Sequence, residues 1–579
     1  MKLELTNWKK DWTLMSAFFS AEEIEKIKSA LQKVKVKTVV YCSLENRFAK
    51  AGGLAAVTMK ILPYLKEANR LPQVLLVSPF YPHIMDESKL QSTGLIFDVP
   101  FAQRQVKVEL LAYTFSYQEP KAGQVTEYYL KANDFFGAHN RLNDPYLYYE
   151  HDRLRNDEAI RENALFFCRA VPLAMRALGI DEHLIFHVQD WQTALIGLTA
   201  KEAMMEGHLK SCGVVQTLHN AFDAFIPWQL LAEIITPGRS QKFASQYHDG
   251  LTALQLGLPL MDGPITTVSE NFAQEFTTDI MQTAHFAPHL QTIFKRTGVY
   301  GINNGMFVNF PPEFSDRKNL TLQQIRKIKT EKRTALLTIL DEYHPPERFG
   351  ELTYRGQSIT HLPETIPIFV MSGRLDYNQK GYDIFLQAIE RFAQDELKVI
   401  LTPMPIKASD LDYFHEVAEK CRGNVTVFPI RMAKGFQELQ IGSTFGVMPS
   451  LYEPFGAAVE YMVNGTITIA RKTGGLADQI DHRQNGLLFR EPPTEYNLTN
   501  IKQLTDAADN VHKRKENRWN QSMVDALHEV MQEAIILYQN HRNEYYRQII
   551  MGFKKAKNFN WSTSAQQYFE VYKKVNQGF

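Results

Sequence analysis

The sequence predicts an α/β protein built from two Rossmann-like domains, each with a doubly wound sheet. Three observations lead to this prediction. The chain has 579 residues, which exceeds the usual size of one domain. Short apolar, β-branched runs alternate with helical stretches, as in parallel sheets covered by helices on both faces. The alternation occurs in two series, and a more polar stretch with two proline pairs separates them.

The first series follows an N-terminal leader, residues 1–36, whose part 21–36 has amphipathic helical spacing. A strand is predicted at 38–42, and apolar runs that begin at 73, 184, 213 and 264 predict further strands. Residues 163–178 have the spacing of a helix. We therefore assign the first Rossmann-like domain to residues 37–310.

The polar stretch 311–365 lacks a comparable series of strands and is interpreted as a linker with one helix, over 322–340. Alternation resumes with strands predicted at 366, 398, 424, 445 and 466, and with a helix over 382–392. From 498 onward the sequence is helical and rich in charge. We assign residues 366–550 to the second domain with a helical extension, and 551–579 to a C-terminal helix.

Composition limits the possible functions. Lys plus Arg and Asp plus Glu number 64 each, so no net charge favours nucleic acid or an anionic membrane. No apolar run approaches the roughly 18 to 20 residues that span a bilayer, and the N-terminus has no secretory pattern, so we expect a cytoplasmic protein. The four cysteines lack metal-ligand spacing and are expected to be buried free thiols. Neither a metal site nor a cofactor is expected.

Ligands of open α/β sheets lie beyond the carboxyl ends of the strands, so the residues that follow each strand are the candidates for a site. In the first domain Lys50, Gly52 and Gly53 follow the first strand, where helix N-terminal amides and a lysine favour an anion. Asp190 and His219 end two later strands and suit a polyhydroxyl ligand. The alternatives are that the glycine pair forms only a turn and that His219 has a purely structural role.

In the second domain Arg374 and Lys380 occupy one strand-to-helix loop and can neutralise a diphosphate without a metal. Glu453 and Gly456 stand where a later strand gives way to a helix, and Thr473-Gly474-Gly475 follow the next strand. A carboxylate there can accept hydrogen bonds from sugar hydroxyls, and backbone amides can bind phosphate. The alternatives are that Arg374 and Lys380 are simply solvated cations and that Glu453 caps a helix.

In chain order these segments resemble the glycogen and starch synthases, which have the GT-B fold of two Rossmann-like domains facing each other across a cleft. The matching segments include KAGGLA at 50, HVQDW at 187, TLHN at 217, GINNG at 301, PSLYEPFG at 449, RKTGGLAD at 471 and NWSTSAQQYFEVYKKV at 560. The last resembles a terminal helix that returns to the first domain. The resemblance implies transfer of glucose, with retention, from ADP-glucose or UDP-glucose to the non-reducing end of an α-1,4-glucan.

The resemblance also implies a role for each site residue. Arg374 and Lys380 would hold the leaving diphosphate, where charge develops in the transition state. Glu453 would contact the donor glucose, His219 the sugar near its hydroxymethyl group, and Asp190 the acceptor or the sugar. The remaining donor-binding residues would be Lys50, Gly52, Gly53, Gly456, Thr473, Gly474 and Gly475.

Several positions depart from the family pattern. Ala56 and Phe307 stand where aspartate is usual, and Gln192 stands where histidine is common. The spacing from Arg374 to Lys380 is six, one longer than in the usual bacterial form and similar to eukaryotic glycogen synthases. Tyr461 lies eight residues after Glu453, as in the glycogen synthase branch, where broader GT-B retaining enzymes often have glutamate. These departures affect donor and acceptor choice. They leave open a GT-B glycosyltransferase with a non-glucan acceptor, and a glucan-binding regulator without turnover.

Overall fold

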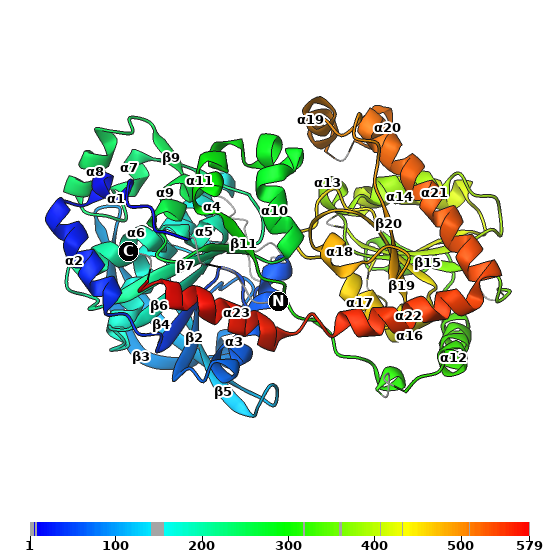
Figure 1. The fold of residues 1–579 in the computed structure, drawn as a ribbon, viewed down its shortest axis with the longest axis horizontal. Helices are drawn as coiled ribbons and strands as arrows, with labels where there is room; N and C mark the ends of the chain where they lie inside the picture. Colours follow the sequence, from blue (N-terminus) through cyan, green and yellow to red (C-terminus); the bar gives the residue numbers. More distant parts are fainter. Residues whose placement is uncertain are drawn as a thin grey trace. The chain divides into compact units, whose positions relative to one another are not determined.

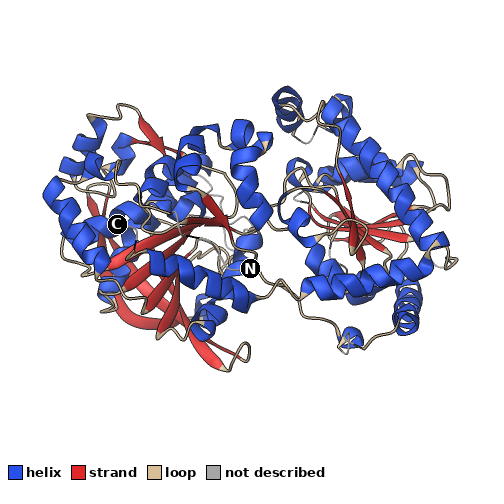
Figure 2. Ribbon diagram, viewed as in Figure 1, coloured by secondary structure: helices blue, strands red, loops and turns tan. Residues whose placement is uncertain are grey.

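The computed structural model describes Leu5 and residues 8–139, 156–315, 319–357, 362–405, 407–430, 432, 434–508 and 510–577. The chain forms two compact units. The first comprises residues 1–268, 276–307 and 560–579, and the second comprises 269–275 and 308–559. Each unit has a sheet surrounded by helices, so the predicted α/β class is confirmed (Figures 1 and 2). Within the described ranges, no helix is long and apolar enough to cross a membrane.

The sheet of the first unit has nine strands in the order β11-β10-β7-β6-β1-β2-β5-β4-β3. The strands from β11 to β5 pair in parallel, and β5, β4 and β3 pair antiparallel. Their bounds are β1 (Thr38–Cys42), β2 (Gln73–Pro79), β3 (Gln91–Phe101), β4 (Arg104–Tyr117), β5 (Gly123–Ala132), β6 (Leu184–Gln189), β7 (Cys212–Leu218), β10 (Ile265–Thr267) and β11 (Val299–Gly301).

The three antiparallel strands at one edge are absent from the sequence prediction. Buried and exposed residues alternate along much of β3 and β4, whereas β1, β6 and β7 are buried throughout. An antiparallel sheet can leave one face in water, so its strands lack the continuous apolar runs that reveal parallel strands. The prediction relied on such runs and therefore found only the parallel part of the sheet.

Helices cover the first sheet, and two small strands lie outside it. The helices are α1 (Met15–Phe18), α2 (Ala21–Gln32), α3 (Gly53–Ala68), α4 (Asn156–Ala177), α5 (Asp190–Ala194), α6 (Ile196–Met205), α7 (Trp228–Leu231), α8 (Pro237–Ala244), α9 (Ala253–Gly257) and α11 (Gln291–Thr297), and the small strands are β8 (Phe225–Pro227) and β9 (Gly250–Thr252). The helix α10 (Glu270–Thr278) is divided between the two units, because residues 269–275 belong to the second. A capping box formed by Ser20 and Glu23 starts α2 in the N-terminal leader. The leader is also tied to the unit through Lys10, whose buried ammonium lies 2.6 Å from the Asp262 carboxylate.

The C-terminal helix α23 (Trp561–Lys574) belongs to the first unit and packs on α3. The Trp561 indole donates to the Met306 carbonyl over 2.8 Å. A Cβ on Gly305 would lie 2.5 Å from Trp561, so only glycine permits this approach. Tyr572 is hydrogen-bonded to the buried His187 ring over 2.9 Å. The helix is thus fixed to the end of the first domain's chain and to the centre of its sheet.

The second unit has a seven-stranded sheet in the order β14-β17-β16-β15-β18-β19-β20. All pairs are parallel except β14 with β17. The bounds are β14 (Arg355–Gly356), β15 (Ile368–Arg374), β16 (Lys398–Met404), β17 (Val425–Val427), β18 (Phe445–Met448), β19 (Ile467–Arg471) and β20 (Gly486–Phe489). The edge strand β14 lies inside the stretch interpreted as a linker, so part of that stretch joins the sheet.

The helices of the second unit are α12 (Leu322–Leu340), α13 (Tyr377–Lys380), α14 (Tyr382–Ile389), α15 (Asp412–Lys420), α16 (Phe436–Gly442), α17 (Ala458–Val463), α18 (Gly474–Gln479), α19 (Leu498–Asp506), α20 (Val511–Glu516), α21 (Arg518–Asn540) and α22 (Arg542–Ala556). A hairpin of β12 (Arg348–Phe349) and β13 (Leu352–Thr353) lies outside the sheet. The helix α12 packs on α16. The unit continues to Phe559, beyond the boundary expected at residue 550.

Candidate functional site

The predicted site residues gather at the point of each sheet where the strand order reverses. In the first sheet the chain runs from β1 to β2 on one side and from β6 to β7 on the other. In the second sheet it runs from β15 to β16 on one side and from β18 to β19 on the other. Such switch points leave a crevice at the carboxyl ends of the strands, where doubly wound folds bind ligands.

Asp190 and His219 come together in the first unit because β6 and β7 are neighbouring parallel strands. Asp190 follows β6, is buried, and has a positive φ of 55° that is uncommon outside glycine. Its Oδ1 accepts the backbone N–H of His219 over 2.6 Å. Burial raises the pKa of Asp190 to about 7, and the nearby Glu45 carboxylate adds to the rise. A carboxyl group that titrates near neutrality is typical of a functional site.

His219 is held as a neutral ring. Burial lowers its pKa to about 4. Its Nε2 lies 2.9 Å from the Gln189 side-chain oxygen, while the Gln189 amide nitrogen donates to the His187 carbonyl. This arrangement places the ring proton on Nε2 and leaves Nδ1 as the acceptor nitrogen. His219 can therefore accept a hydrogen bond from a hydroxyl group of a ligand.

The loop before α3 differs from the expected open anion site. Lys50, Gly52 and Gly53 are exposed, as a ligand-contacting loop requires. The backbone amides of Ala51 and Gly52, however, donate to one oxygen of Glu45, over 3.1 and 2.8 Å. A carboxylate near a helix N-terminus is favourable for the same reason that a phosphate is. The Gly52 amide is thus engaged by the protein itself.

Sequence reasoning assigned no role to Glu45 or Gln189. Glu45 is buried and connects the end of β1 to the glycine loop, and Gln189 fixes the tautomer of His219. A carboxylate between a first strand and a glycine pair was the available signal for Glu45. No local pattern marks Gln189, because its role depends on the pairing of β6 with β7.

In the second unit Arg374, Lys380 and Glu453 occupy two adjoining loops. Lys380 Nζ lies 2.7 Å from Glu453 Oε2, and the Ser450 hydroxyl donates to the same oxygen over 3.0 Å. Arg374 ends β15, its side chain is 50% exposed, and it donates to Gln379 over 2.7 Å. Glu453 is buried. The site therefore presents an accessible guanidinium beside an ion pair with a buried carboxylate.

Glycines allow the loops of this site to pack backbone against backbone. Gly381 has a φ of 70°, and a Cβ there would lie 2.3 Å from the Pro449 carbonyl oxygen. Gly474 has a φ of 45°, and its Cβ would lie 1.9 Å from the carbonyl oxygen of Glu453. Gly456, with a φ of 87°, turns the chain after Glu453. Each of these positions requires glycine for its conformation or for close approach.

The backbone amides at the start of α18 also have partners within the second unit. The Gly475 amide donates to the Glu453 carbonyl over 2.9 Å. The Gly474 amide donates to the Glu275 carboxylate over 2.7 Å, and the buried Thr473 hydroxyl lies 3.4 Å from the same oxygen. Sequence reasoning expected these amides to face the donor. In this structure a carboxylate occupies the position of an anion at the Gly474 amide.

Two of the positions compared with the family pattern have a structural explanation. The Phe307 ring packs edge-on against Trp561 at 5.3 Å, so it anchors the C-terminal helix within the first unit. Tyr461 is buried, and a Cβ on Gly446 would meet its ring at 2.7 Å, so it fills the space under β18. Nothing in the structure explains Ala56 or Gln192.

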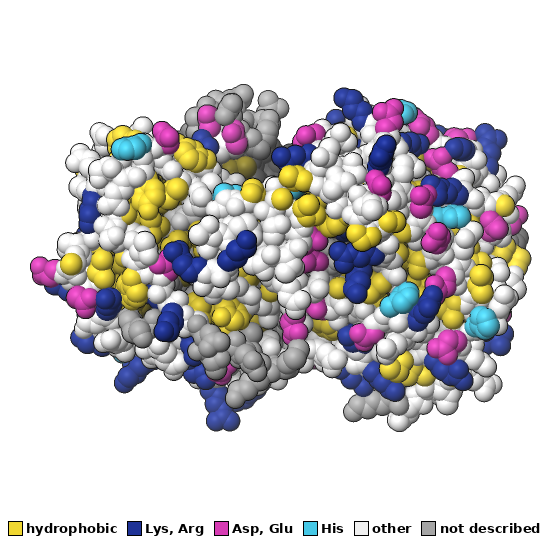
Figure 3. All heavy atoms as spheres, turned by 45° about the horizontal axis from the view of Figure 1, so that its top comes forward, with side chains coloured by type: hydrophobic (Ala, Val, Ile, Leu, Met, Phe, Trp, Pro, Cys, Tyr) yellow, Lys and Arg dark blue, Asp and Glu magenta, His cyan; other side chains and the backbone are white. Residues whose placement is uncertain are grey.

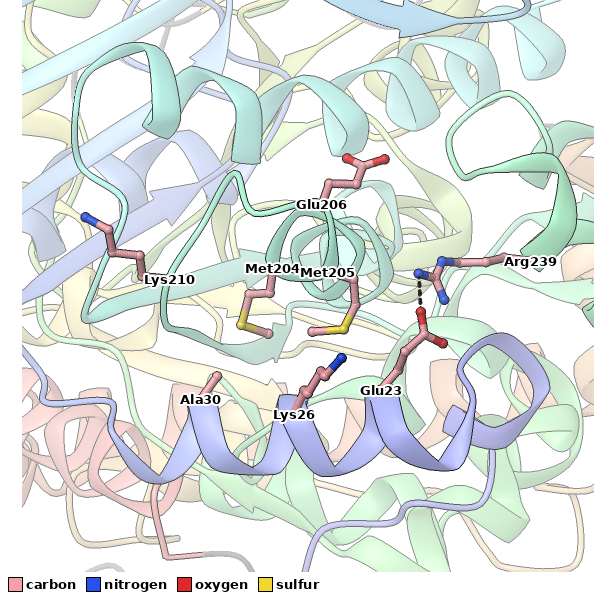
Figure 4. A pocket seen from close by; sticks show the side chains of 8 residues that line it. All are labelled: Glu23, Lys26, Ala30, Met204, Met205, Glu206, Lys210 and Arg239. Atoms are coloured by element: carbon pink, nitrogen blue, oxygen red, sulfur yellow. Dashed lines mark hydrogen bonds and ion pairs between the residues drawn. The ribbon is translucent and has the colours of Figure 1, made fainter.

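A cavity of about 350 Å³ lies elsewhere in the first unit, between α2 and the end of α6 (Figure 4). It is lined by Glu23, Lys26, Ala30, Met204, Met205, Glu206, Lys210 and Arg239, none of which is a predicted site residue. Arg239 donates to Glu23 over 2.7 Å across it.

Among the described residues, no three His, Cys, Asp or Glu side chains are placed to hold a metal ion. Cationic and anionic side chains are interspersed on the face drawn in Figure 3.

Comparisons with family models agree with the division into two units. A model described as the starch synthase catalytic domain matches residues 38–295. A second model, for glycosyl transferases group 1, matches residues 357–522. The first match covers the strands that carry Asp190 and His219, and the second covers Arg374, Lys380, Glu453 and the glycine pair at 474.

Whole-chain relatives give the same result. A glycogen synthase of Thermosipho africanus is 26% identical over 529 residues, which cover 86% of this chain and 96% of that protein. A glycogen synthase of Alkaliphilus metalliredigens is 24% identical over 561 residues, which cover 91% of this chain and 97% of that protein. The catalytic domain of starch synthase IV from Arabidopsis thaliana, solved with ADP and acarbose, has a TM-score of 0.67 at 18% identity. The match covers 94% of this chain and 99% of that one. At that identity the structural match supports the fold.

Proposed function

The chain belongs to the glycogen and starch synthase family of GT-B glycosyltransferases, and from this premise we propose that it transfers glucose from ADP-glucose or UDP-glucose to an α-1,4-glucan. Transfer would occur at the non-reducing end, with retention of configuration. Neither a metal nor a cofactor takes part in the proposed reaction. The observation that carries the proposal is the group of Arg374, Lys380 and Glu453 at the switch point of the second sheet.

The two cations stabilise the leaving group in this proposal. Negative charge develops on the nucleoside diphosphate as its bond to glucose breaks, and charges already in place stabilise that state most. The accessible Arg374 guanidinium can bind two phosphate oxygens at once, whereas Lys380 contributes a point charge. The Lys380 ammonium is held by Glu453 at 2.7 Å, so it is positioned before the donor arrives.

Glu453 and His219 contact sugar hydroxyls in the proposed reaction. Glu453 accepts hydrogen bonds only, and it lies beside the diphosphate-binding lysine, where the donor glucose follows the phosphates. His219 remains neutral at pH 7 and offers Nδ1 as an acceptor. Asp190 accepts from a sugar hydroxyl when it is ionised, which its pKa of about 7 makes dependent on pH in the physiological range. Lys50, Gly52 and Gly53 are assigned to the diphosphate from the first unit.

The linkage formed on the acceptor tests the proposal. Purified protein is incubated with glycogen and with donor labelled in the glucose, and the polymer is then digested by an exo-acting enzyme specific for terminal α-1,4 bonds. We expect the label to enter the polymer and to be released early in the digestion. If the label enters only small sugars, the acceptor is a small sugar and the glucan acceptor is rejected. Tight glycogen binding without incorporation would favour a regulator.

A further inference from the structure

The helical extension after β20 reaches the loop that carries Lys380. The helices α19, α20 and α21 form this extension, and α21 packs along α14 (Figure 1). α14 begins two residues after Lys380. The extension therefore lies directly behind the diphosphate-binding loop. Neither the sequence prediction nor the proposed function gives this extension a role.

Arg514, from α20, is the main contact of the extension with that loop. Its side chain is fully buried. Nε donates to Asp383 Oδ2 over 2.8 Å, Nη2 donates to the Tyr377 carbonyl over 3.0 Å, and Nη1 donates to Asn378 Oδ1 over 2.5 Å. Nη1 also donates to the Leu504 carbonyl over 3.0 Å. One guanidinium thus joins α13, α14 and α19.

The partner of Arg514 is equally buried and well satisfied. Asp383 has no exposed side-chain area, and its Oδ2 also accepts from the Asn520 side chain over 2.8 Å. A buried ion pair is retained at a cost in desolvation, and apolar residues of similar volume often serve stability as well. Stability alone therefore does not account for this network. Its effect on the position of the neighbouring residues is the more relevant property.

That geometry reaches Lys380 through α13. The helix has only four residues, which is too short to be stable without outside contacts. Two of them, Tyr377 and Asn378, are bound by Arg514, and the Asn378 amide donates in return to the Thr505 carbonyl over 3.0 Å. Lys380 ends the same helix and pairs with Glu453. The position of the Lys380 ammonium therefore depends on contacts that the extension supplies.

The start of α21 makes a similar contact behind the loop that carries Glu453. Trp519 donates from its indole to Glu491 over 3.0 Å, and Glu491 forms a buried ion pair with Arg471. Arg471 donates from Nη1 to the Leu451 carbonyl over 2.7 Å. Leu451 lies two residues before Glu453. Both loops of the candidate site are thus supported from the same region of the extension.

We propose that Arg514 is a positioning residue for the donor site, which fixes α13 so that Lys380 meets the diphosphate of a sugar nucleotide. The proposal rests on the proposed function for the identity of the ligand. It assigns to the helical extension the task of ordering the diphosphate loop from behind, without contact with the substrate.

Two variants test the proposal while leaving a charge opposite Asp383. Arg514→Lys keeps the cation but loses the planar fork that reaches Tyr377 and Asn378. Asn378→Ala keeps the buried ion pair and removes both side-chain hydrogen bonds of residue 378. We expect each variant to raise the KM for the sugar nucleotide by about 5- to 20-fold, the effect of one or two lost hydrogen bonds. The KM for glycogen should remain unchanged.

Hydrogen–deuterium exchange of the peptide 376–381 provides a readout that does not require turnover. The Lys380 amide donates to the Asp376 carbonyl in α13, so it reports whether that helix is formed. We expect it to exchange at least about fivefold faster in both variants, because the helix opens locally more often. The matched control is Arg391→Met. It removes an exposed ion pair with Asp525, 2.7 Å long, which joins the turn after α14 to α21 and involves no residue of α13.

Each result has a distinct meaning. Unchanged exchange at 376–381 together with an unchanged donor KM, in folded Asn378→Ala protein, would overturn the positioning role. If Arg514→Lys fails to fold, Asn378→Ala alone decides. Faster exchange in the variants, with a wild-type protein that turns over neither donor, would keep the positioning role and reject the proposed function.

Discussion

Replacement of Lys380 by methionine removes one of the two cations assigned to the leaving diphosphate, and leaves the chain length of the side chain nearly unchanged. In the wild type Lys380 Nζ lies 2.7 Å from Glu453 Oε2. Loss of one preplaced group that stabilises transition-state charge lowers turnover by about 10²- to 10³-fold, or roughly 2.7–4 kcal/mol. We expect kcat/KM for the sugar nucleotide to fall in that range, measured by release of nucleoside diphosphate with glycogen as acceptor.

The same change affects stability, and a second variant separates the two effects. Glu453 is 5% exposed, and without Lys380 its side chain keeps the hydrogen bond that the Ser450 hydroxyl donates over 3.0 Å. A buried group deprived of a partner costs about 1–3 kcal/mol, which urea unfolding can measure. The double variant Lys380→Met, Glu453→Gln should recover part of this stability but none of the activity. A loss of less than about tenfold in kcat/KM for Lys380→Met, in folded protein, would refute the assigned role.

Asp190 has a pKa of about 7 against an ordinary value of 3.8, so the unfolded chain ionises first, and stability falls as pH rises from about 4 to 7. Unfolding of Asp190→Asn across this range should lack that component, which is on the order of 4 kcal/mol, whereas an identical pH dependence would contradict the assignment. If the ionised Asp190 accepts from the sugar, wild-type kcat/KM should rise with pH through about 7, and a flat profile would count against it. Gly474→Ala places a Cβ 1.9 Å from the Glu453 carbonyl oxygen, so we expect donor turnover to be lost while circular dichroism shows a folded protein; full activity would show that the loop adapts. Trp561→Ala should lower the free energy of unfolding by about 3–5 kcal/mol in urea titration, and a loss below about 1 kcal/mol would mean that α23 contributes little to the first unit.

The sequence predicted the fold class and the parallel strands because both leave local patterns. Continuous apolar runs such as the one at 184–189 mark strands that are buried on both faces, and the structure has strands there. The edge strands β3, β4 and β5 escaped prediction because their residues alternate between core and solvent over long antiparallel stretches. A prediction based on continuous apolar runs cannot detect such strands.

The candidate site could be predicted residue by residue, but its internal contacts could not. Lys380 and Glu453 were each identified from their place after a strand, whereas their 2.7 Å contact follows from the pairing of β15 with β18. The engagement of the Gly52 and Gly474 amides by Glu45 and Glu275 depends on where carboxylates fold back onto helix starts. These contacts join residues that are distant in sequence or carry no motif, so they become visible only in three dimensions.

The most direct test of the donor site is the release of nucleoside diphosphate with glycogen as acceptor, with ADP-glucose and UDP-glucose compared at equal concentration. Glu453→Gln serves as the control, since it keeps the shape of the side chain and removes its charge. The account predicts turnover with at least one of the two donors, and a loss of about 10²-fold or more in the control. Release no greater than the blank with both donors, from folded wild-type protein, would contradict it.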